Sequence, residues 1–381
     1  MKNKIYYLDN AATSFPKPKN VVKEVNKCLT SYCGNAGRGS HKLSLYAASK
    51  IYECREEICS LVNFPTPENI VFVPSCTYGL NLVIKGALSQ GDHVLISDME
   101  HNSVLRPIHK LSSEGKITYD IFPCLLKTDD EIIKSIKSKI KSNTKLIICN
   151  HQSNICSFSA PIDKIGELCQ YYNVLFCVDG AQSMGHYRID IQKSNINYLV
   201  APAHKGLYGI QGAGFVAINS KNELETLIEG GNGINSLEKT MPNLLPERHE
   251  SGTLPLPSIV GLNEGIKEIK KRGIDEISAH ERELFRLLRD GLLNISGINV
   301  YAVNFEGSTL SFDHEKLSAE RLSSLLDNQS IYLRAGFHCS ALAHTSLGTT
   351  EKGTLRASFG IFNTPNDIDK TLTAINNICK Y

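Results

Sequence analysis

Short, continuous apolar runs recur between residues 69 and 218, and they constrain the fold of this 381-residue chain more than any other feature. An apolar run without polar alternation is typical of a strand buried on both faces. Segments with helical spacing separate most of these runs, at 45–62, 78–88, 129–141 and 162–172. Strands that alternate with helices predict a mainly parallel sheet of an α/β protein, covered by helices. The apolar runs themselves lie at 69–73, 92–97, 145–150, 174–179, 197–201 and 214–218.

A stretch with two prolines, ESGTLPLPS at 250–258, ends this alternation. Shorter strand and helix signals come after two long helical segments, and this change of pattern predicts a second, smaller α+β domain. We expect a large domain at 16–252 and a small domain made of 1–15 and 253–381. The signals behind this division are helices at 258–272 and 275–294 and shorter elements at 298–302, 309–313, 318–327 and 354–359.

Charge and hydropathy exclude several classes of protein. The net charge is only +2, which indicates neither a nucleic-acid-binding nor a membrane-binding surface. No stretch approaches the roughly 20 apolar residues of a membrane span, and the first residues lack the apolar core of a signal peptide. We therefore expect a cytoplasmic protein.

Cysteine is frequent, with 12 residues, but a chain of this length does not need a disulfide framework. No CxxC pair occurs, which argues against a structural zinc site, and we expect no metal. Cys149 and Cys177 lie in apolar runs and are expected to be buried. Cys339, in RAGFHCSALAH, has polar and basic neighbours, so it is the candidate for a reactive thiol.

Polar side chains cluster where the predicted strands end, and ligands bind at the carboxyl ends of parallel strands. Each of these residues also has an ordinary structural interpretation. Asp179 could form a turn, His101 could sit in a loop or core, and Lys205 could point into water. Ser75 could cap a helix, or the helix start behind it could hold a phosphate. The strand-end residues are Ser75, Cys76, Thr77, His101, Asn150, His151, Asn154, Asp179, Gln182, His186, His204 and Lys205.

Taken together, these residues have a chemical meaning that none has alone. A lysine amine forms a Schiff base with the aldehyde of pyridoxal phosphate (PLP), and that cofactor also needs an acidic partner for its ring nitrogen and ligands for its phosphate. Lys205, Asp179 and Thr77 supply these three kinds of group. A nicotinamide site is disfavoured because GIQGAG, at 209–214, leads into a strand and not into a helix.

The motifs also carry a resemblance to a known family. The chain resembles the cysteine desulfurases of the class V aminotransferase family. Its motifs come in the same order as in that family and span residues 7 to 364. Its R-x-G-x-H-C arrangement is closest to the SufS-like, selenocysteine-lyase-like branch. The motifs are YLDNAATSFPKP, GNAGRGSHKLS, SCTYGLNLVIKGAL, DMEHNSVLRP, VDGAQSMGH, APAHKGLYGIQGAG, ESGTLPLPS, LRAGFHCSALAH and TLRASFGIFNT.

The resemblance implies PLP-dependent transferase fold type I, with a seven-stranded type of sheet in a large PLP-binding domain, and a homodimer. It also implies a role for each matching residue. The Schiff-base lysine is Lys205, the partner of the ring nitrogen is Asp179, the ligand of the phenolic oxygen is Gln182, and the stacked imidazole is His101. Cys339 is implied as the nucleophile that accepts sulfur. Phosphate ligands are implied at Cys76, Thr77, His204 and, from the neighbouring subunit, Thr253; substrate-side residues are Ala12, His41, Asn154, Arg334 and Arg356.

Two of these residues keep alternative interpretations. Arg334 is either a second carboxylate ligand or part of a structural ion pair. His41 is either a substrate-side group or a neighbour of a helix cap. Arg356 offers a bidentate fork to the substrate carboxylate, which a lysine would not replace.

The chain departs from the family pattern at three positions. Ala203 stands where the family often has serine, which removes a phosphate ligand. Phe337 and Ser340 flank His338 and Cys339 where the branch usually has His and Ala. These two changes affect the surroundings of the nucleophile and its preference between sulfur and selenium. The polar segment that follows, SALAHTSLGTTEKGT, is expected to be mobile over the site.

The expected reaction converts L-cysteine to L-alanine and leaves the sulfur on Cys339 as a persulfide, for an unidentified acceptor protein. In it Lys205 removes the α-proton and the Cys339 thiolate attacks the substrate sulfur. The alternatives are a selenocysteine lyase, a class V aminotransferase or C–S lyase, and a non-catalytic scaffold. Cys339 argues against transamination, and the intact set of Lys205, Asp179 and Cys339 argues against a scaffold.

Overall fold

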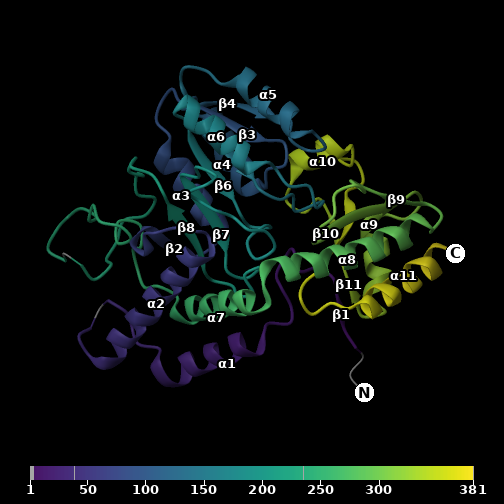
Figure 1. The fold of residues 1–381 in the computed structure, drawn as a ribbon, viewed down its shortest axis with the longest axis horizontal. Coiled ribbons are helices and arrows are strands. Elements are labelled where there is room, and N and C mark those ends of the chain that lie inside the picture. Colours follow the sequence, from purple (N-terminus) through teal and green to yellow (C-terminus); the bar gives the residue numbers. More distant parts are fainter. Residues whose placement is uncertain (1–3, 38, 235, 381) are drawn as a thin grey trace.

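The computed structural model describes residues 4–37, 39–234 and 236–380. A seven-stranded sheet with helices on both faces forms its centre (Figure 1). In spatial order, the strands are β2 (Ile70–Val73), β8 (Gly214–Ile218), β7 (Tyr198–Pro202), β6 (Leu175–Asp179), β5 (Thr144–Asn150), β3 (His93–Ser97) and β4 (Thr118–Phe122).

The sheet is mainly parallel, as expected, but it is mixed. β8 pairs antiparallel with both of its neighbours, β7 and β2. The other strand pairs are parallel. The edge strand β4 was not among the expected strands, because its residues are half-exposed and it lacks the continuous apolar run of the central strands.

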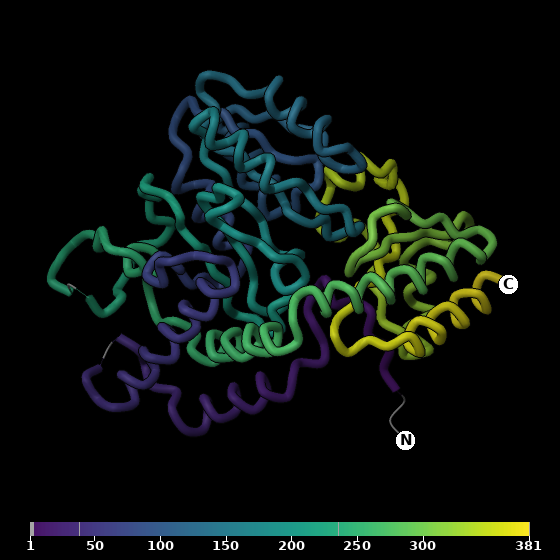
Figure 2. The backbone as a smooth tube through the Cα atoms, in the orientation of Figure 1, coloured from purple at the N-terminus to yellow at the C-terminus, as the bar shows by residue number. Residues whose placement is uncertain are grey.

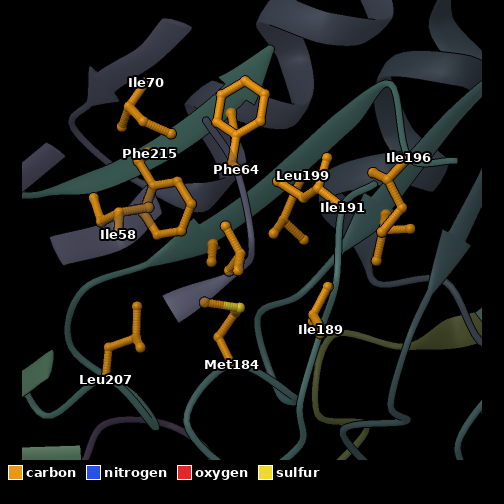
Figure 3. Packing of buried hydrophobic residues seen from close by; sticks show 14 of the residues in the cluster. Ile58, Phe64, Ile70, Met184, Ile189, Ile191, Ile196, Leu199, Leu207 and Phe215 are labelled. Carbon is orange, nitrogen blue, oxygen red and sulfur yellow. The ribbon is translucent and has the colours of Figure 1, made fainter. Parts of the chain in front are cut away.

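Successive strand residues point to opposite faces of the sheet. Both faces are apolar, and a layer of helices covers each of them. Ile70 and Phe72 of β2 belong to the apolar cluster on one face, and Val71 and Val73 belong to the cluster on the other. Figure 3 shows part of the first cluster, with Phe215 between Ile58 and Ile70. The first face carries α2 (Lys42–Leu61), α5 (Asp129–Lys139), α6 (Ile162–Tyr172) and α7 (Leu256–Arg272), and the second carries α3 (Cys76–Ala87) and α4 (Asn102–Ser113).

A smaller four-stranded antiparallel sheet lies beside the first, and its helices enclose an apolar core of their own. Its strands, in spatial order, are β12 (Arg334–Gly336), β13 (Thr354–Ser358), β10 (Thr309–His314) and β9 (Ile298–Val300). The helices of this part are α8 (Ile274–Leu293), α9 (Ala319–Asp327) and α11 (Pro365–Cys379), and the short α10 (Ala341–Leu347) follows Cys339.

The N-terminal residues return to this smaller part of the molecule. β1 (Tyr6–Tyr7) pairs in parallel with β11 (Ile331–Tyr332). The chain then runs to α1 (Lys19–Lys27), which packs on α7 (Figure 2). A π-helical turn, Cys28–Tyr32, and a 3₁₀ turn, Pro67–Asn69, complete the helical elements in the described residues.

The expected strands agree with those observed to within two residues. The expected helices do so to within three, whereas α1, α4, α10 and α11 had no counterpart in the expectations. The boundaries at 16–252 and 253–381 stay a prediction. Within the described residues, 219–255 contain neither helix nor strand, and this segment projects from the body beside β8 and α2 (Figures 1 and 2). None of the helices in the described ranges is both long enough and apolar enough to cross a membrane.

Candidate active site

Lys205 follows the end of β7, where Pro202 closes the strand and a turn begins. It lines a cavity of about 150 Å³ at the carboxyl ends of the parallel strands. Among the described residues, the ones that line this cavity are Ser75, Cys76, Thr77, His101, Ser103, Asn150, Asn154, Asp179, Ala181, Gln182, Pro202, His204 and Lys205. The structure thus brings together most of the residues proposed from the sequence for the cofactor, and one, Asn154, proposed for the substrate.

The cavity is lined by an amine, that of Lys205, and a carboxyl group, that of Asp179. Burial lowers the pKa of Lys205, and Cys76 and Asp179 oppose this shift. Burial raises the pKa of Asp179, although the Ala181 N–H donates to its Oδ1 at 2.9 Å. The cavity therefore offers an amine that loses its proton more readily than usual, and a carboxyl group that a cationic partner would stabilise as the carboxylate.

His101 caps the start of α4, and the hydrogen bonds of its imidazole define the tautomer. Its Nδ1 accepts from the Ser103 backbone N–H at 3.0 Å and lies 2.7 Å from the Ser103 hydroxyl oxygen. Burial, with further contributions from Lys205 and Arg334, lowers the pKa of His101 to about 4. The ring is therefore neutral near pH 7. Because Nδ1 accepts, the ring proton resides on Nε2.

The start of α3 supplies groups suited to an anion. The Ser75 hydroxyl caps the helix by accepting from the Tyr78 N–H at 3.2 Å, and the first amides of the helix, at Cys76 and Thr77, have no carbonyl partner within it. The Thr77 hydroxyl lies 2.9 Å from that of Ser103. His204 has a buried Nδ1 without a hydrogen-bond partner among the described residues. A phosphate group fits this set of donors.

The other chemical requirements of PLP are met in the same cavity. Lys205 provides the amine, and Asp179 provides a buried carboxyl group whose pKa the nearby Lys205 lowers against the effect of burial. Gln182 lines the cavity while its Nε2 donates to the Ala11 carbonyl at 3.0 Å, next to Ala12. The residues present therefore fit this cofactor.

Arg356 is bonded to the cavity residue Asn154 and is buried, with 1% of its surface exposed. Its Nη2 pairs with Asp9 Oδ1 at 2.7 Å, and its Nη1 donates to the Asn154 carbonyl at 3.0 Å. Its Nε has no hydrogen-bond partner in the described part of the chain. A buried guanidinium with an unused donor can bind a carboxylate that enters from the cavity.

Cys339 is exposed, in contrast to Cys149 and Cys177, which are buried as expected. It lies on the loop between β12 and α10, and its Sγ is 3.7 Å from Arg334 Nη2. The guanidinium therefore places a positive charge beside the sulfur. The segment expected to be mobile after Cys339 begins with helix α10, in which Ala343 and His344 are buried.

Six of the proposed residues do not line the cavity: Ala12, His41, Thr253, Arg334, Cys339 and Arg356. His41 is exposed and caps α2, since its Nδ1 accepts from the Ser44 N–H at 3.2 Å. This contact corresponds to the second of its two interpretations. Thr253 is exposed on the segment that precedes α7 and does not line the cavity of its own chain.

The structure adds residues that sequence reasoning missed. Ser103 lines the cavity between His101 and Thr77, and a serine two residues after a strand-end histidine was the available signal. Asp9 pairs with Arg356, and Lys17 donates to the His204 carbonyl at 2.9 Å. No local pattern indicates these two contacts, because their partners are far away in the sequence.

Comparisons with known proteins bear on this geometry. A model of the class-V aminotransferase family matches residues 6–371. A probable cysteine desulfurase of Pyrococcus abyssi is 30% identical, over 100% of this chain and 96% of that protein. A second one, of Halalkalibacterium halodurans, is 31% identical over 99% of this chain and 94% of its own.

Solved structures agree with these sequence matches. An apo cysteine desulfurase from Thermococcus onnurineus NA1 superposes with a TM-score of 0.88 at 27% identity, and covers 99% of this chain and 95% of its own. The cysteine desulfurase CsdA from Escherichia coli has the same TM-score and the same coverages at 24% identity. At that identity, the second likeness concerns the fold.

Proposed function

The chain belongs to the class-V aminotransferase family, and from that premise we propose that it is a PLP-dependent cysteine desulfurase. Its fold is fold type I of the PLP-dependent transferases. The proposed enzyme converts L-cysteine to L-alanine and leaves the substrate's sulfur on Cys339 as a persulfide. One observation carries this proposal above the others: Lys205 and Asp179 line one cavity, and Cys339 lies on a loop bonded to Asn154 of the same cavity.

The cofactor would be held by residues from several strand ends. Lys205 would bind its aldehyde carbon, Asp179 its ring nitrogen and Gln182 its phenolic oxygen. The α3 amides at Cys76 and Thr77, together with His204, would hold its phosphate. When bound, PLP supplies an electron-withdrawing ring that stabilises negative charge at the substrate α-carbon.

The residues of the chain then divide the work. Arg356, with Asn154, would bind the substrate carboxylate, and His101, with its proton on Nε2, would stack on the cofactor ring. The Lys205 amine, whose pKa burial lowers, accepts the α-proton. The Cys339 thiolate attacks the substrate sulfur: an S–S bond forms, the Cβ–S bond breaks, and Cβ keeps the electron pair and takes a proton. Lys205 returns a proton to the α-carbon, which gives alanine.

The finer assignments are also part of this proposal. The enzyme is a homodimer in which Thr253 reaches the partner's phosphate site, since Thr253 is exposed and outside its own cavity. Selenocysteine is a second candidate substrate, because Phe337 and Ser340 alter the surroundings of Cys339. The sulfur passes from Cys339 to an acceptor protein.

The test compares Cys339→Ser with Cys33→Ser, a control at another exposed cysteine. An alcohol ionises much less readily than a thiol, so Cys339→Ser keeps its yellow colour and its spectral change with cysteine but loses alanine formation by about 100-fold or more. Mass spectrometry of the wild type places the extra sulfur on the Cys339 peptide. Sulfur on another cysteine, or wild-type turnover by Cys339→Ser, contradicts the proposal.

A further inference from the structure

The Asn154 side chain is hydrogen-bonded to both neighbours of Cys339. Its Nδ2 donates to the His338 carbonyl at 2.7 Å, and its Oδ1 accepts from the Ser340 hydroxyl at 2.5 Å. All three residues are buried. The orientation of the amide follows from chemistry, because a backbone carbonyl can only accept, so the amide NH₂ must face His338 and the Ser340 hydroxyl must donate.

The backbone carbonyl of Cys339 is hydrogen-bonded to a second element of the cavity, the start of α4. The Asn102 N–H donates to the Cys339 carbonyl at 2.8 Å, and Asn102 begins α4 directly after His101. Bonds at three consecutive residues of the loop, 338, 339 and 340, therefore connect it to two cavity elements, the loop after β5 and the start of α4.

The backbone of this loop needs such support. His338 and Cys339 have φ values of +49° and +60°, and Gly336 has a φ of +105°. Two consecutive residues with side chains in the left-handed region are strained, and such a conformation persists only where surrounding contacts maintain it. Here the contacts come from Asn154 and Asn102 on the cavity side, and from Thr354, whose carbonyl and hydroxyl oxygens lie 3.1 and 3.0 Å from His338 Nε2.

We propose that Asn154 and Ser340 form a clamp that holds Cys339 in position to attack the substrate sulfur, with Ser340 as the positioning residue. Ser340 acts through the amide: without its hydroxyl, Asn154 Oδ1 is left without a donor, and the amide is free to turn away from the His338 carbonyl. Both bonds thus depend on one hydroxyl group. The role assigned to Cys339 rests on the proposed function, whereas the clamp itself does not.

The matched variants are Ser340→Ala and Ser346→Ala. Ser346 lies in α10, a few residues after Ser340. Its hydroxyl also donates one hydrogen bond to the larger part of the molecule, to Oδ2 of Asp98, which follows β3, at 2.8 Å. The first measurement uses the PLP-loaded protein without substrate. Ser340→Ala speeds both iodoacetamide alkylation of Cys339 and hydrogen exchange of the 336–340 peptide severalfold, and Ser346→Ala changes neither.

The second measurement is a single turnover with cysteine. Ser340→Ala slows persulfide formation about tenfold, because small displacements of a reacting group have effects of at least this size. The initial spectral change on adding cysteine slows much less than persulfide formation, since it does not require the thiol and Arg356 still binds the substrate carboxylate.

Two results overturn the clamp. One is alkylation and exchange in Ser340→Ala that match Ser346→Ala. The other is a spectral change that slows as much as persulfide formation, which would place Ser340 in substrate binding and not in positioning Cys339. If the wild type forms no persulfide on Cys339, the proposed function fails instead, while the alkylation and exchange measurements still decide whether the clamp exists.

Discussion

At the scale of single residues, the backbone carbonyl of His204 fixes the turn that contains Lys205. The His204 carbonyl, which immediately precedes Lys205, accepts from the Ser14 N–H at 3.0 Å, from the Thr13 and Ser14 hydroxyls at 3.1 Å each, and from Lys17 Nζ at 2.9 Å. The residues after β1 therefore fix the backbone of the proposed cofactor-binding lysine. This arrangement also places a second lysine in a partly buried setting, since burial lowers the pKa of Lys17 to about 8.

The lowered pKa of Lys17 predicts a pH effect on stability. Between about pH 8 and the ordinary lysine value of 10.5, the unfolded chain binds more protons than the folded one, so this group makes the free energy of unfolding rise with pH. Lys17→Met removes that contribution. Unfolding with urea at a series of pH values should therefore give a wild-type minus variant difference that increases from pH 8 to 10.5. A difference independent of pH would show that Lys17 titrates normally.

At the scale of elements, two loops at the cavity edge touch through glycines. A Cβ on Gly185, in the loop after β6, would lie 2.1 Å from the Gly206 carbonyl oxygen. A Cβ on Gly206 would meet the Met184 carbonyl oxygen at 2.3 Å and the His186 ring at 2.4 Å. Only glycine permits this approach, which brings the loop with Asp179 and Gln182 against the turn with Lys205.

Gly185→Ala should therefore disturb the cavity and the fold together. Gly185 has a φ of +89°, and Gly115, with a φ of +70° and no atom within 4 Å of an added Cβ, is the control for backbone strain alone. Gly115→Ala should lose about 1 kcal/mol of stability. Gly185→Ala should lose about 1–3 kcal/mol more from overpacking and should retain less PLP. Urea unfolding and cofactor content measure both effects, and equal losses in the two variants would exclude the contact.

At the scale of the whole molecule, the segment at 219–255 leaves large apolar side chains exposed to solvent. Four large apolar side chains are exposed along it, and Leu237 is fully exposed. Thr253 lies near its end, outside the cavity of its own chain. The exposed apolar residues are Ile228, Ile234, Leu237 and Leu244. A second copy of the chain would cover such residues, in keeping with the homodimer proposed above.

The homodimer makes a prediction about Thr253. Sedimentation velocity should give twice the mass of the 42.1 kDa chain at assay concentration. Thr253→Ala should weaken retention of PLP about tenfold to hundredfold, the scale of one lost hydrogen bond to a charged group, because one phosphate ligand is removed from each site. Thr240→Ala, at another exposed threonine of the same segment, should not. A fully active monomer would contradict the dimer.

The sequence by itself determined the central architecture. Buried strands leave a local signal, a continuous apolar run, so β2, β3, β5, β6, β7 and β8 could be predicted to within two residues. It also located most of the residues that line the cavity, since strand ends in a parallel sheet share one edge, although it missed Ser103 and included His151 and His186, which do not line it. The half-exposed edge strand β4 leaves a weaker signal, and it was missed.

Only the tertiary structure decided the contacts that give these residues their settings. Asp9 and Arg356 are 347 residues apart, and Ser340 and Asn154 are 186 apart. The sequence marked Cys339 as reactive and Ser340 as unusual, but it contained no sign that an asparagine from the loop after β5 bonds to both sides of the cysteine. Such pairings depend on how the smaller sheet packs against the larger one, and no periodicity or local motif encodes that packing, because the groups that meet there belong to separate elements.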